Sequence, residues 1–345
     1  MNGASQGTMR RITGVGHKKN FCICGLHKCS LRYCLILYPI SAMLKRIIKF
    51  IFFGNYFVGI LAVALSLESC VQLRLPLNSL VYYLLLFCST IMYYTYAYTG
   101  ALNTGKSVNP RTEWYKENHH FIVRTQRFFF GACVVLAAIF FIKNYEGILH
   151  LPLQYWLLMM MVLLAGLLYY GLLPKSFYKL NLRNTGWLKA FVIGFVWACC
   201  ANLLSFTVLQ VERGHTDVDI RFLIWLFVKN WMFCTVNAIM FDIKDYADDS
   251  NRQLKTFVVR FGLRKTIFFV LIPLLVIGLL SMVAVTALRG LGAIPICINL
   301  IPFILLLFVA WSMQKPHKIL YYLVVIDGLV FLKALCGIAA MQFVH

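Results

Sequence analysis

The chain has 345 residues, of which 61% are hydrophobic and 13% charged, whereas soluble domains contain about 25% charged residues. Apolar runs of about 20 residues recur along the chain, and each is long enough to cross a bilayer as a helix. These runs exclude a soluble protein and an outer-membrane barrel, whose strands are short and alternating. We therefore predict an all-α polytopic membrane protein embedded in a lipid bilayer. The net charge of +21 is interpreted as loop anchoring, and no nucleic-acid partner is expected.

The sequence predicts two regions, a tail over residues 1–42 and a transmembrane domain over residues 43–345. The tail is polar and basic, and we expect it to be a disordered cytosolic segment with free thiols. Its cysteines have a spacing that matches no standard zinc pattern. A metal site that also uses nearby histidines is the alternative interpretation. The tail cysteines are Cys22, Cys24, Cys29 and Cys34.

Nine apolar segments are candidate membrane spans. They cover roughly residues 47–66, 79–100, 127–142, 152–174, 187–210, 220–241, 266–288, 293–313 and 319–343. With the N-terminus in the cytoplasm, most Lys and Arg residues fall in cytoplasmic loops, as the positive-inside rule requires. The C-terminus is then predicted to lie on the opposite side of the membrane.

The segment after the sixth span gathers carboxylates that are scarce elsewhere. It reads "FDIKDYADDSNRQLKTFVVRFG" (241–262) and contains four of the 12 acidic residues. If the helix of the sixth span continues, Asp242, Asp245 and Asp249 share one face because their spacing is i, i+3, i+7. Three neighbouring carboxylates repel one another, and a hard cation such as Mg²⁺ relieves that repulsion. The pattern predicts a metal–diphosphate site at the cytoplasmic edge of the membrane, and a solvated acidic loop is the alternative.

Basic residues on the same predicted membrane side extend this site. Lys255 follows the aspartates directly, and Lys179 and Arg183 lie with Lys175 and Lys189 in the linker after the fourth span. Basic side chains bind phosphate oxygens that a metal does not contact. We expect two or three of them to contact a ligand, while positive-inside anchoring explains most of the others.

These two segments together resemble the UbiA superfamily of intramembrane prenyltransferases. The aspartate segment is similar to the second aspartate motif of that family, with Asp242, Asp245 and Asp249 at its three aspartate positions. Its trailing positions are matched by Lys255, Thr256 and Gly262. The stretch "LPKSFYKLNLRNTGWLKAFVIGFVWA" (173–198) resembles the basic linker between the fourth and fifth helices of the family, with Lys179 the best-matched residue.

The resemblance covers roughly residues 45–345 and implies a helical bundle around a central cavity. It further implies Mg²⁺-dependent transfer of a prenyl chain from a prenyl diphosphate to a lipophilic or aromatic acceptor. In such a site the three aspartates hold the metal, and metal and basic residues stabilise the departing diphosphate.

The sequence departs from the family after the second span. The family carries a first aspartate motif there, but residues 94–121 contain no aspartate, and Asn103 is the remnant of the motif. Arg111 is a candidate for binding a diphosphate directly in its place. The loss of this motif supports an alternative function, a non-catalytic binder or carrier of isoprenoid lipids on the same scaffold.

Polar residues within spans are expected to face the bundle interior, because charge at bilayer depth is costly. Asn237 lies five residues before Asp242 and is predicted to reach the substrate cavity. We also expect Asp327 of the ninth span to form an ion pair with Lys229 or Lys333.

Overall fold

The computed structural model describes residues 43–99, 110–170, 186–214, 217–251, 253–315 and 317–344. The predicted tail over residues 1–42 lies outside the described residues. Every regular element in the described part of the chain is helical, as the composition predicts. The chain divides into two units, Met1–Ile48 and Lys49–His345, and the helices below belong to the second unit.

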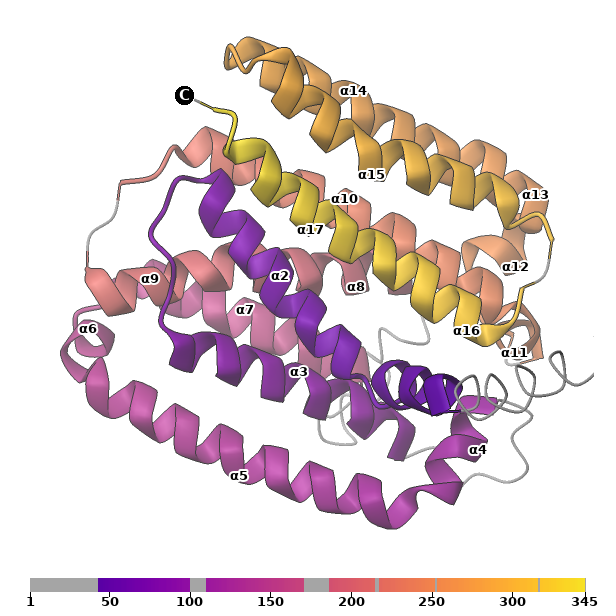
Figure 1. The fold of residues 1–345 in the computed structure, drawn as a ribbon, viewed down its shortest axis with the longest axis horizontal. Helices are drawn as coiled ribbons and strands as arrows, with labels where there is room; N and C mark the ends of the chain where they lie inside the picture. Colours follow the sequence, from indigo (N-terminus) through magenta and orange to yellow (C-terminus); the bar gives the residue numbers. More distant parts are fainter. Residues whose placement is uncertain are drawn as a thin grey trace, which may run out of the picture. The chain divides into compact units, whose positions relative to one another are not determined.

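Four helical segments lie at the centre of this unit (Figure 1). They are α2 (Tyr56–Gln72), α10 (Ile220–Lys244), α17 (Asp327–Met341) and α8 (Leu188–Ala198). Helix α8 continues through a π-helical turn, η4 (Cys199–Leu204), into α9 (Ser205–Arg213). Helix α8 packs against α10, and α17 packs against α2.

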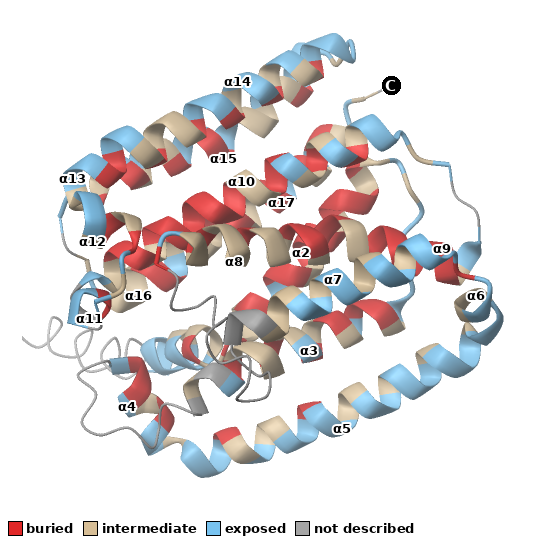
Figure 2. Ribbon diagram, turned by 180° about the vertical axis from the view of Figure 1, so that it is seen from behind, coloured by how far each residue is buried: buried red, intermediate tan, exposed pale blue. Residues whose placement is uncertain are grey.

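The remaining long helices surround this centre. They are α3 (Leu80–Thr99), α5 (His119–Lys143), α7 (Leu153–Tyr170), α14 (Ile272–Leu288) and α15 (Ala293–Ser312). Figure 2 shows that burial is concentrated in α2, α10 and α17, whereas α5 is largely exposed. The exposed side chains of α5 are predominantly apolar, as expected for a helix that contacts lipid.

Short helices lie in the connections between the long ones. They are α4 (Pro110–Glu117), α6 (Tyr145–Leu149), α11 (Tyr246–Asn251), α12 (Phe257–Phe261), α13 (Leu263–Thr266) and α16 (Ile319–Tyr321). Two of them run into π-helical turns, η5 (Ile267–Leu271) after α13 and η6 (Tyr322–Ile326) after α16.

The described helices are compatible with the nine predicted spans. Six helical runs are long and apolar enough to cross a membrane, or seven if Met43–Phe53 and Tyr56–Gln72 form one bent span. Helices α3 and α7 are shorter apolar helices. The boundaries of the first predicted span were wrong, because Asn55 interrupts the helix with a left-handed backbone (φ 64°) and α2 then runs to Gln72. The third span is longer than predicted and covers all 25 residues of α5.

A buried charge network joins α2, α10 and α17. Lys333 Nζ lies 2.6 Å from Glu68 Oε2, and Lys229 Nζ lies 3.8 Å from Glu68 Oε1. Lys229 also donates to Gln72 Oε1 at 3.0 Å. The prediction that Asp327 forms an ion pair with one of these lysines was therefore wrong. Asp327 begins α17 and lies six positions before Lys333, which places the two residues about 9 Å apart along the helix axis and about 120° apart around it.

Candidate functional site

Two of the predicted aspartates form ion pairs with the same lysine. Lys189 Nζ donates to Asp242 Oδ1 at 2.9 Å and lies 3.6 Å from Asp249 Oδ2. Asp242 belongs to the last turn of α10, Asp249 to α11, and Lys189 to the first turn of α8. The packing of α8 against α10 therefore places an ammonium group between two carboxylates that follow each other closely in sequence.

The third aspartate has a different partner. Helix α10 ends at Lys244, and Asp245 takes a non-helical backbone (φ −91°, ψ 7°) before α11 begins. The amide of Asp249 still donates to the carbonyl of Asp245 at 2.8 Å, so the chain nearly keeps its helical path. The Asp245 carboxylate pairs with Lys244 at 2.6 Å and is 32% exposed. The structure thus unites Asp242 and Asp249, while Asp245 pairs with a separate cation.

Both paired aspartates are buried, Asp242 at 2% exposure and Asp249 at 5% exposure. The second carboxylate oxygen of Asp242, Oδ2, has no hydrogen-bond partner within the described part of the chain. A buried carboxylate oxygen without a partner is unfavourable, so a further cation would stabilise this cluster.

These groups fit a hard divalent cation. Mg²⁺ prefers oxygen ligands and commonly uses one or two protein carboxylates, with substrate phosphates and water as the other ligands. Asp242 and Asp249 supply two such carboxylates. Within the described ranges, three or more His, Cys, Asp or Glu side chains do not gather as a ready-made metal site. The fit therefore depends on two carboxylates and the unpartnered oxygen of Asp242.

The two sequence segments that predicted the site are in contact. Gly186, just before α8, has a left-handed backbone (φ +65°), and a Cβ there would lie 2.4 Å from the carbonyl oxygen of Lys255. Only glycine permits this approach. Lys255 itself is exposed and precedes Thr256, whose hydroxyl accepts from Val259 N and caps α12. The start of α8 is thus fixed against the basic end of the aspartate segment.

Asn237 is buried in α10 at 5% exposure. Neither its amide nitrogen nor its amide oxygen has a hydrogen-bond partner among the described residues. Buried amides normally have partners, and exceptions of this kind point to a bound water, ion or substrate group. Asn237 thus faces the interior of the bundle, and its predicted contact with a substrate stays a prediction.

Arg111 lies in a buried junction. Its guanidinium donates to the carbonyl of Phe53 at 3.0 Å and the hydroxyl of Tyr98 at 2.9 Å, and it also contacts Asn55. Tyr115 donates to the same carbonyl at 3.0 Å, and burial raises the pKa of its phenol, which stays neutral. These contacts tie α4 to α3 and to the turn before α2. The predicted diphosphate contact of Arg111 stays a prediction.

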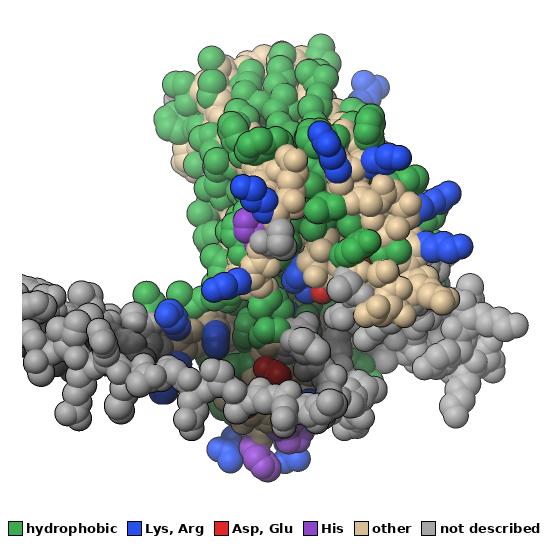
Figure 3. All heavy atoms as spheres, turned by 90° about the vertical axis from the view of Figure 1, so that its right-hand side faces the viewer, with side chains coloured by type: hydrophobic (Ala, Val, Ile, Leu, Met, Phe, Trp, Pro, Cys, Tyr) green, Lys and Arg blue, Asp and Glu red, His purple; other side chains and the backbone are tan. Residues whose placement is uncertain are grey.

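Three other predicted ligand-binding residues lie outside the described residues, namely Asn103, Lys179 and Arg183. The end of the unit that carries α11, α12 and α13 is nevertheless rich in exposed basic residues, and Figure 3 shows Lys and Arg side chains on this face. Its exposed members include Lys255, Arg260, Arg264, Lys265, Lys315 and Lys318. This surface favours anionic ligands.

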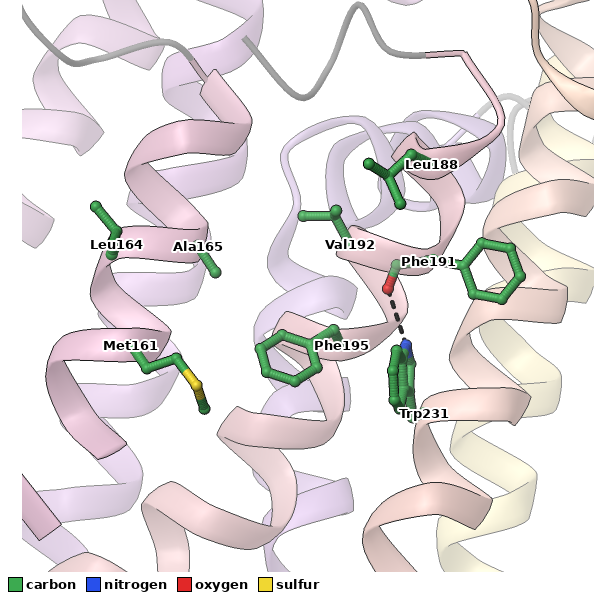
Figure 4. Close-up of a pocket in the computed structure, with 8 residues that line it drawn as sticks. All are labelled: Met161, Leu164, Ala165, Leu188, Phe191, Val192, Phe195 and Trp231. Carbon is green, nitrogen blue, oxygen red and sulfur yellow. Dashed lines mark hydrogen bonds between the residues drawn. The ribbon is translucent and has the colours of Figure 1, made fainter. Parts of the chain in front are cut away.

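An apolar groove of about 290 Å³ lies between α7, α8 and α10 (Figure 4). Its walls include Met161 and Leu164 of α7, Phe191 and Phe195 of α8, and Trp231 of α10. The indole N–H of Trp231 donates to the carbonyl of Phe191 at 2.9 Å, which satisfies its polar atom. The lining side chains of the groove are apolar, and the aspartates are not among them.

Sequence reasoning did not single out Lys189 as the partner of the aspartates. It treated this residue as one of four basic linker residues. The available signal was its position, because Lys189 lies in the first turn of an apolar helix whereas the other three precede that helix. A lysine is unfavourable near the positive end of a helix dipole unless carboxylates compensate.

The apolar helices and the buried acidic cluster at their end define a multi-pass, α-helical membrane protein with a candidate cation site. The chain belongs to the UbiA prenyltransferase family, whose family model matches residues 108–318. The matched region includes the aspartates, Lys189 and Lys255. Family membership, inferred above from the motif, is thereby confirmed.

No curated protein matches the chain. Two solved structures of a UbiA homologue from Archaeoglobus fulgidus resemble it, one bound to DMAPP and Mg²⁺ and one bound to Cd²⁺. The first is 14% identical with a TM-score of 0.47, and the second is 16% identical with a TM-score of 0.42. In both cases the match covers 84% of this chain and 99% of the other chain.

Proposed function

We propose that this protein is a Mg²⁺-dependent prenyltransferase that transfers a prenyl chain from a prenyl diphosphate to a lipophilic or aromatic acceptor within the membrane. The observation that carries the proposal is the buried pair of Asp242 and Asp249 on Lys189, with one carboxylate oxygen left without a partner. Membership of a prenyltransferase family gives this acidic cluster its chemical context.

Each predicted residue has a role in this proposal. Asp242, Asp245 and Asp249 hold Mg²⁺, and Lys179, Arg183 and Lys255 bind the diphosphate. Asn103, Arg111 and Asn237 are assigned to substrate binding. When bound, Mg²⁺ would offset the negative charge that accumulates on the departing diphosphate.

The reaction moves one alkyl group. The bond breaks between C1 of the prenyl chain and the oxygen that joins it to the diphosphate. The electron pair of this bond leaves with the diphosphate. A new bond forms between C1 and the acceptor, which releases a proton. Basic side chains near the aspartates stabilise the leaving group, and the apolar bundle limits the access of water to the reactive prenyl carbon.

We also propose that the aspartate site faces the cytoplasm, together with the N-terminus. Support comes from the basic residues that surround α11, α12 and α13, because cytoplasmic loops carry an excess of Lys and Arg.

The test is diphosphate release by the full-length protein in lipid nanodiscs, with Mg²⁺, prenyl diphosphates of several lengths and a panel of lipophilic aromatic acceptors. We expect release to need Mg²⁺ and to stop in Asp242→Asn, because Asp242 carries the carboxylate oxygen without a partner. Asp219→Asn is the matched control, because it removes a carboxylate at the opposite end of α10 and asparagine is an equally good N-cap. Unchanged turnover in Asp242→Asn would refute this assignment of the site.

A second function is favoured by one specific observation. Residues 94–121 contain no aspartate. Arg111, which was expected to bind a diphosphate in place of that motif, instead donates hydrogen bonds to protein oxygens. A non-catalytic isoprenoid-lipid binder or carrier would need only the acidic cluster and the scaffold. Tight Mg²⁺-dependent binding of a prenyl diphosphate without diphosphate release, across all acceptors, would identify this function instead.

A further inference from the structure

Lys189 occupies the position in which a cation would neutralise Asp242 and Asp249. Its side chain is 13% exposed, and its ammonium group lies 2.9 Å from one carboxylate oxygen and 3.6 Å from the other. The partner carboxylates are more buried still, so water screens this interaction weakly. In the ligand-free protein Lys189 is therefore a positive charge held within the cluster.

A divalent ion on the free oxygen of Asp242 would lie close to this ammonium group, because Lys189 holds the other oxygen of the same carboxylate. Two like charges at that separation repel strongly in a partly buried site. Binding of the ion alone is thus opposed by Lys189. A diphosphate removes the opposition, because its oxygens accept charge-assisted hydrogen bonds from the displaced ammonium group.

We propose that Lys189 couples the binding of the divalent cation to that of the diphosphate. In the ligand-free protein it holds Asp242 and Asp249 together, and it turns to the diphosphate when the cation takes the carboxylates. This inference rests on the proposed function of the aspartate site. By linkage, each ligand then raises the affinity of the protein for the other by the same factor.

The test uses Mn²⁺ as a spectroscopic probe for the full-length protein in nanodiscs. Free and bound Mn²⁺ are measured by electron paramagnetic resonance for the wild type and Lys189→Met, with and without a prenyl diphosphate. We expect Lys189→Met to bind Mn²⁺ alone several-fold more tightly, since a repulsive charge is gone. We expect it to bind the prenyl diphosphate in the presence of Mn²⁺ about tenfold more weakly, since a charge-assisted hydrogen bond is lost.

The affinity for Mn²⁺ is thus expected to rise and the affinity for the prenyl diphosphate to fall. This distinguishes the coupling role from a purely structural ion pair, whose loss would weaken both affinities. Lys143→Met removes an exposed charge at the end of α5, away from the basic surface around α11, α12 and α13, and should change neither affinity. Lys189→Gln keeps a hydrogen-bond donor for Asp242 and replaces Lys189→Met if that variant does not fold.

Unchanged or weaker Mn²⁺ binding by the Lys189 variants, beside a wild type that binds both ligands, overturns the coupling role alone. A wild type that binds no Mn²⁺ even with a prenyl diphosphate overturns the proposed function as well. Equal diphosphate affinity in wild type and variants also contradicts the proposal, because the ammonium group would then have no phosphate contact.

Discussion

Glu68 is a fully buried carboxylate on α2 that pairs with lysines from two other helices. The gain from burying such ions is small, but the loss of one partner is costly because the remaining charges stay buried without compensation. Gln72 and Asn230 complete the network by accepting from Lys229 and Lys333 respectively. Glu68 therefore matters for stability through the two lysines that it neutralises.

Replacement of Glu68 by alanine is expected to destabilise the protein by about 3–5 kcal/mol, because two buried ammonium groups lose their carboxylate. Thermal unfolding in detergent, followed by circular dichroism, measures the effect as a lower Tm. Glu146→Ala removes an exposed carboxylate from α6 and should change stability by less than about 0.5 kcal/mol. Equal Tm values for Glu68→Ala and wild type would contradict this role.

For single residues, the sequence predicts which charged side chains are buried within spans, but not which of them form ion pairs with one another. Hydropathy marks Lys229 and Lys333 as buried charges that need a partner. Their partner Glu68 is 265 residues away from Lys333, and that contact exists only through the packing of α17 on α2. The same reason hides the contact between Lys189 and Asp242, which depends on how α8 crosses α10.

The crossing of α8 and α10 is the element that builds the candidate site. Gly194 allows it, because a Cβ at this position would lie 2.7 Å from the backbone nitrogen of Thr235 and 2.9 Å from the carbonyl oxygen of Trp231. Backbone atoms in a helix cannot move aside as a flexible side chain does. A larger residue must therefore separate the two helices and withdraw Lys189 from Asp242.

Gly194→Ala is expected to cost about 1–3 kcal/mol of stability through overpacking, and to weaken Mn²⁺-dependent binding of a prenyl diphosphate. The Tm and the affinity are measured on the same preparation. The control is Gly131→Ala in α5, where a Cβ meets nothing within 4 Å and alanine is the better helix former. Indistinguishable behaviour of the two variants would show that α8 and α10 do not need this close approach.

The helix end at Asp245 illustrates what element-level patterns omit. The spacing i, i+3, i+7 predicts one acidic face over Asp242, Asp245 and Asp249 if the helix is uninterrupted. The structure ends α10 at Lys244, and a pair of neighbouring residues, Lys244 and Asp245, neutralise each other. The spacing therefore marked the three aspartates as a candidate site. The ion pairs in the structure decide that Asp242 and Asp249 share Lys189 while Asp245 pairs with Lys244.

For the molecule as a whole, apolar run length predicts the helical architecture well. Six or seven spans are evident in the described helices, and two shorter apolar helices make them compatible with nine. Boundaries near Asn55 and His119 escaped prediction because a left-handed turn and a polar helix start leave little trace in hydropathy. The membrane topology is a prediction from the placement of Lys and Arg along the sequence.

An odd number of spans with a cytoplasmic N-terminus places the C-terminus on the opposite side of the membrane. A C-terminal alkaline phosphatase fusion in bacterial cells should therefore be active, and the corresponding green fluorescent protein fusion dark. Fusions truncated after residue 265, in the basic segment that follows the aspartates, should behave in the opposite way. An active phosphatase at that position would reverse the proposed orientation of the site.

The central claim is that the aspartate cluster binds a prenyl diphosphate through a divalent cation. The most direct measurement is calorimetric titration of the full-length protein with prenyl diphosphates of different chain lengths, in Mg²⁺ or in EDTA. We predict binding of at least one of them in Mg²⁺ and none in EDTA, with an affinity about tenfold or more lower in Asp242→Asn and unchanged in Asp219→Asn. Binding that is equal in EDTA or in Asp242→Asn, or absent at every chain length, would contradict the claim.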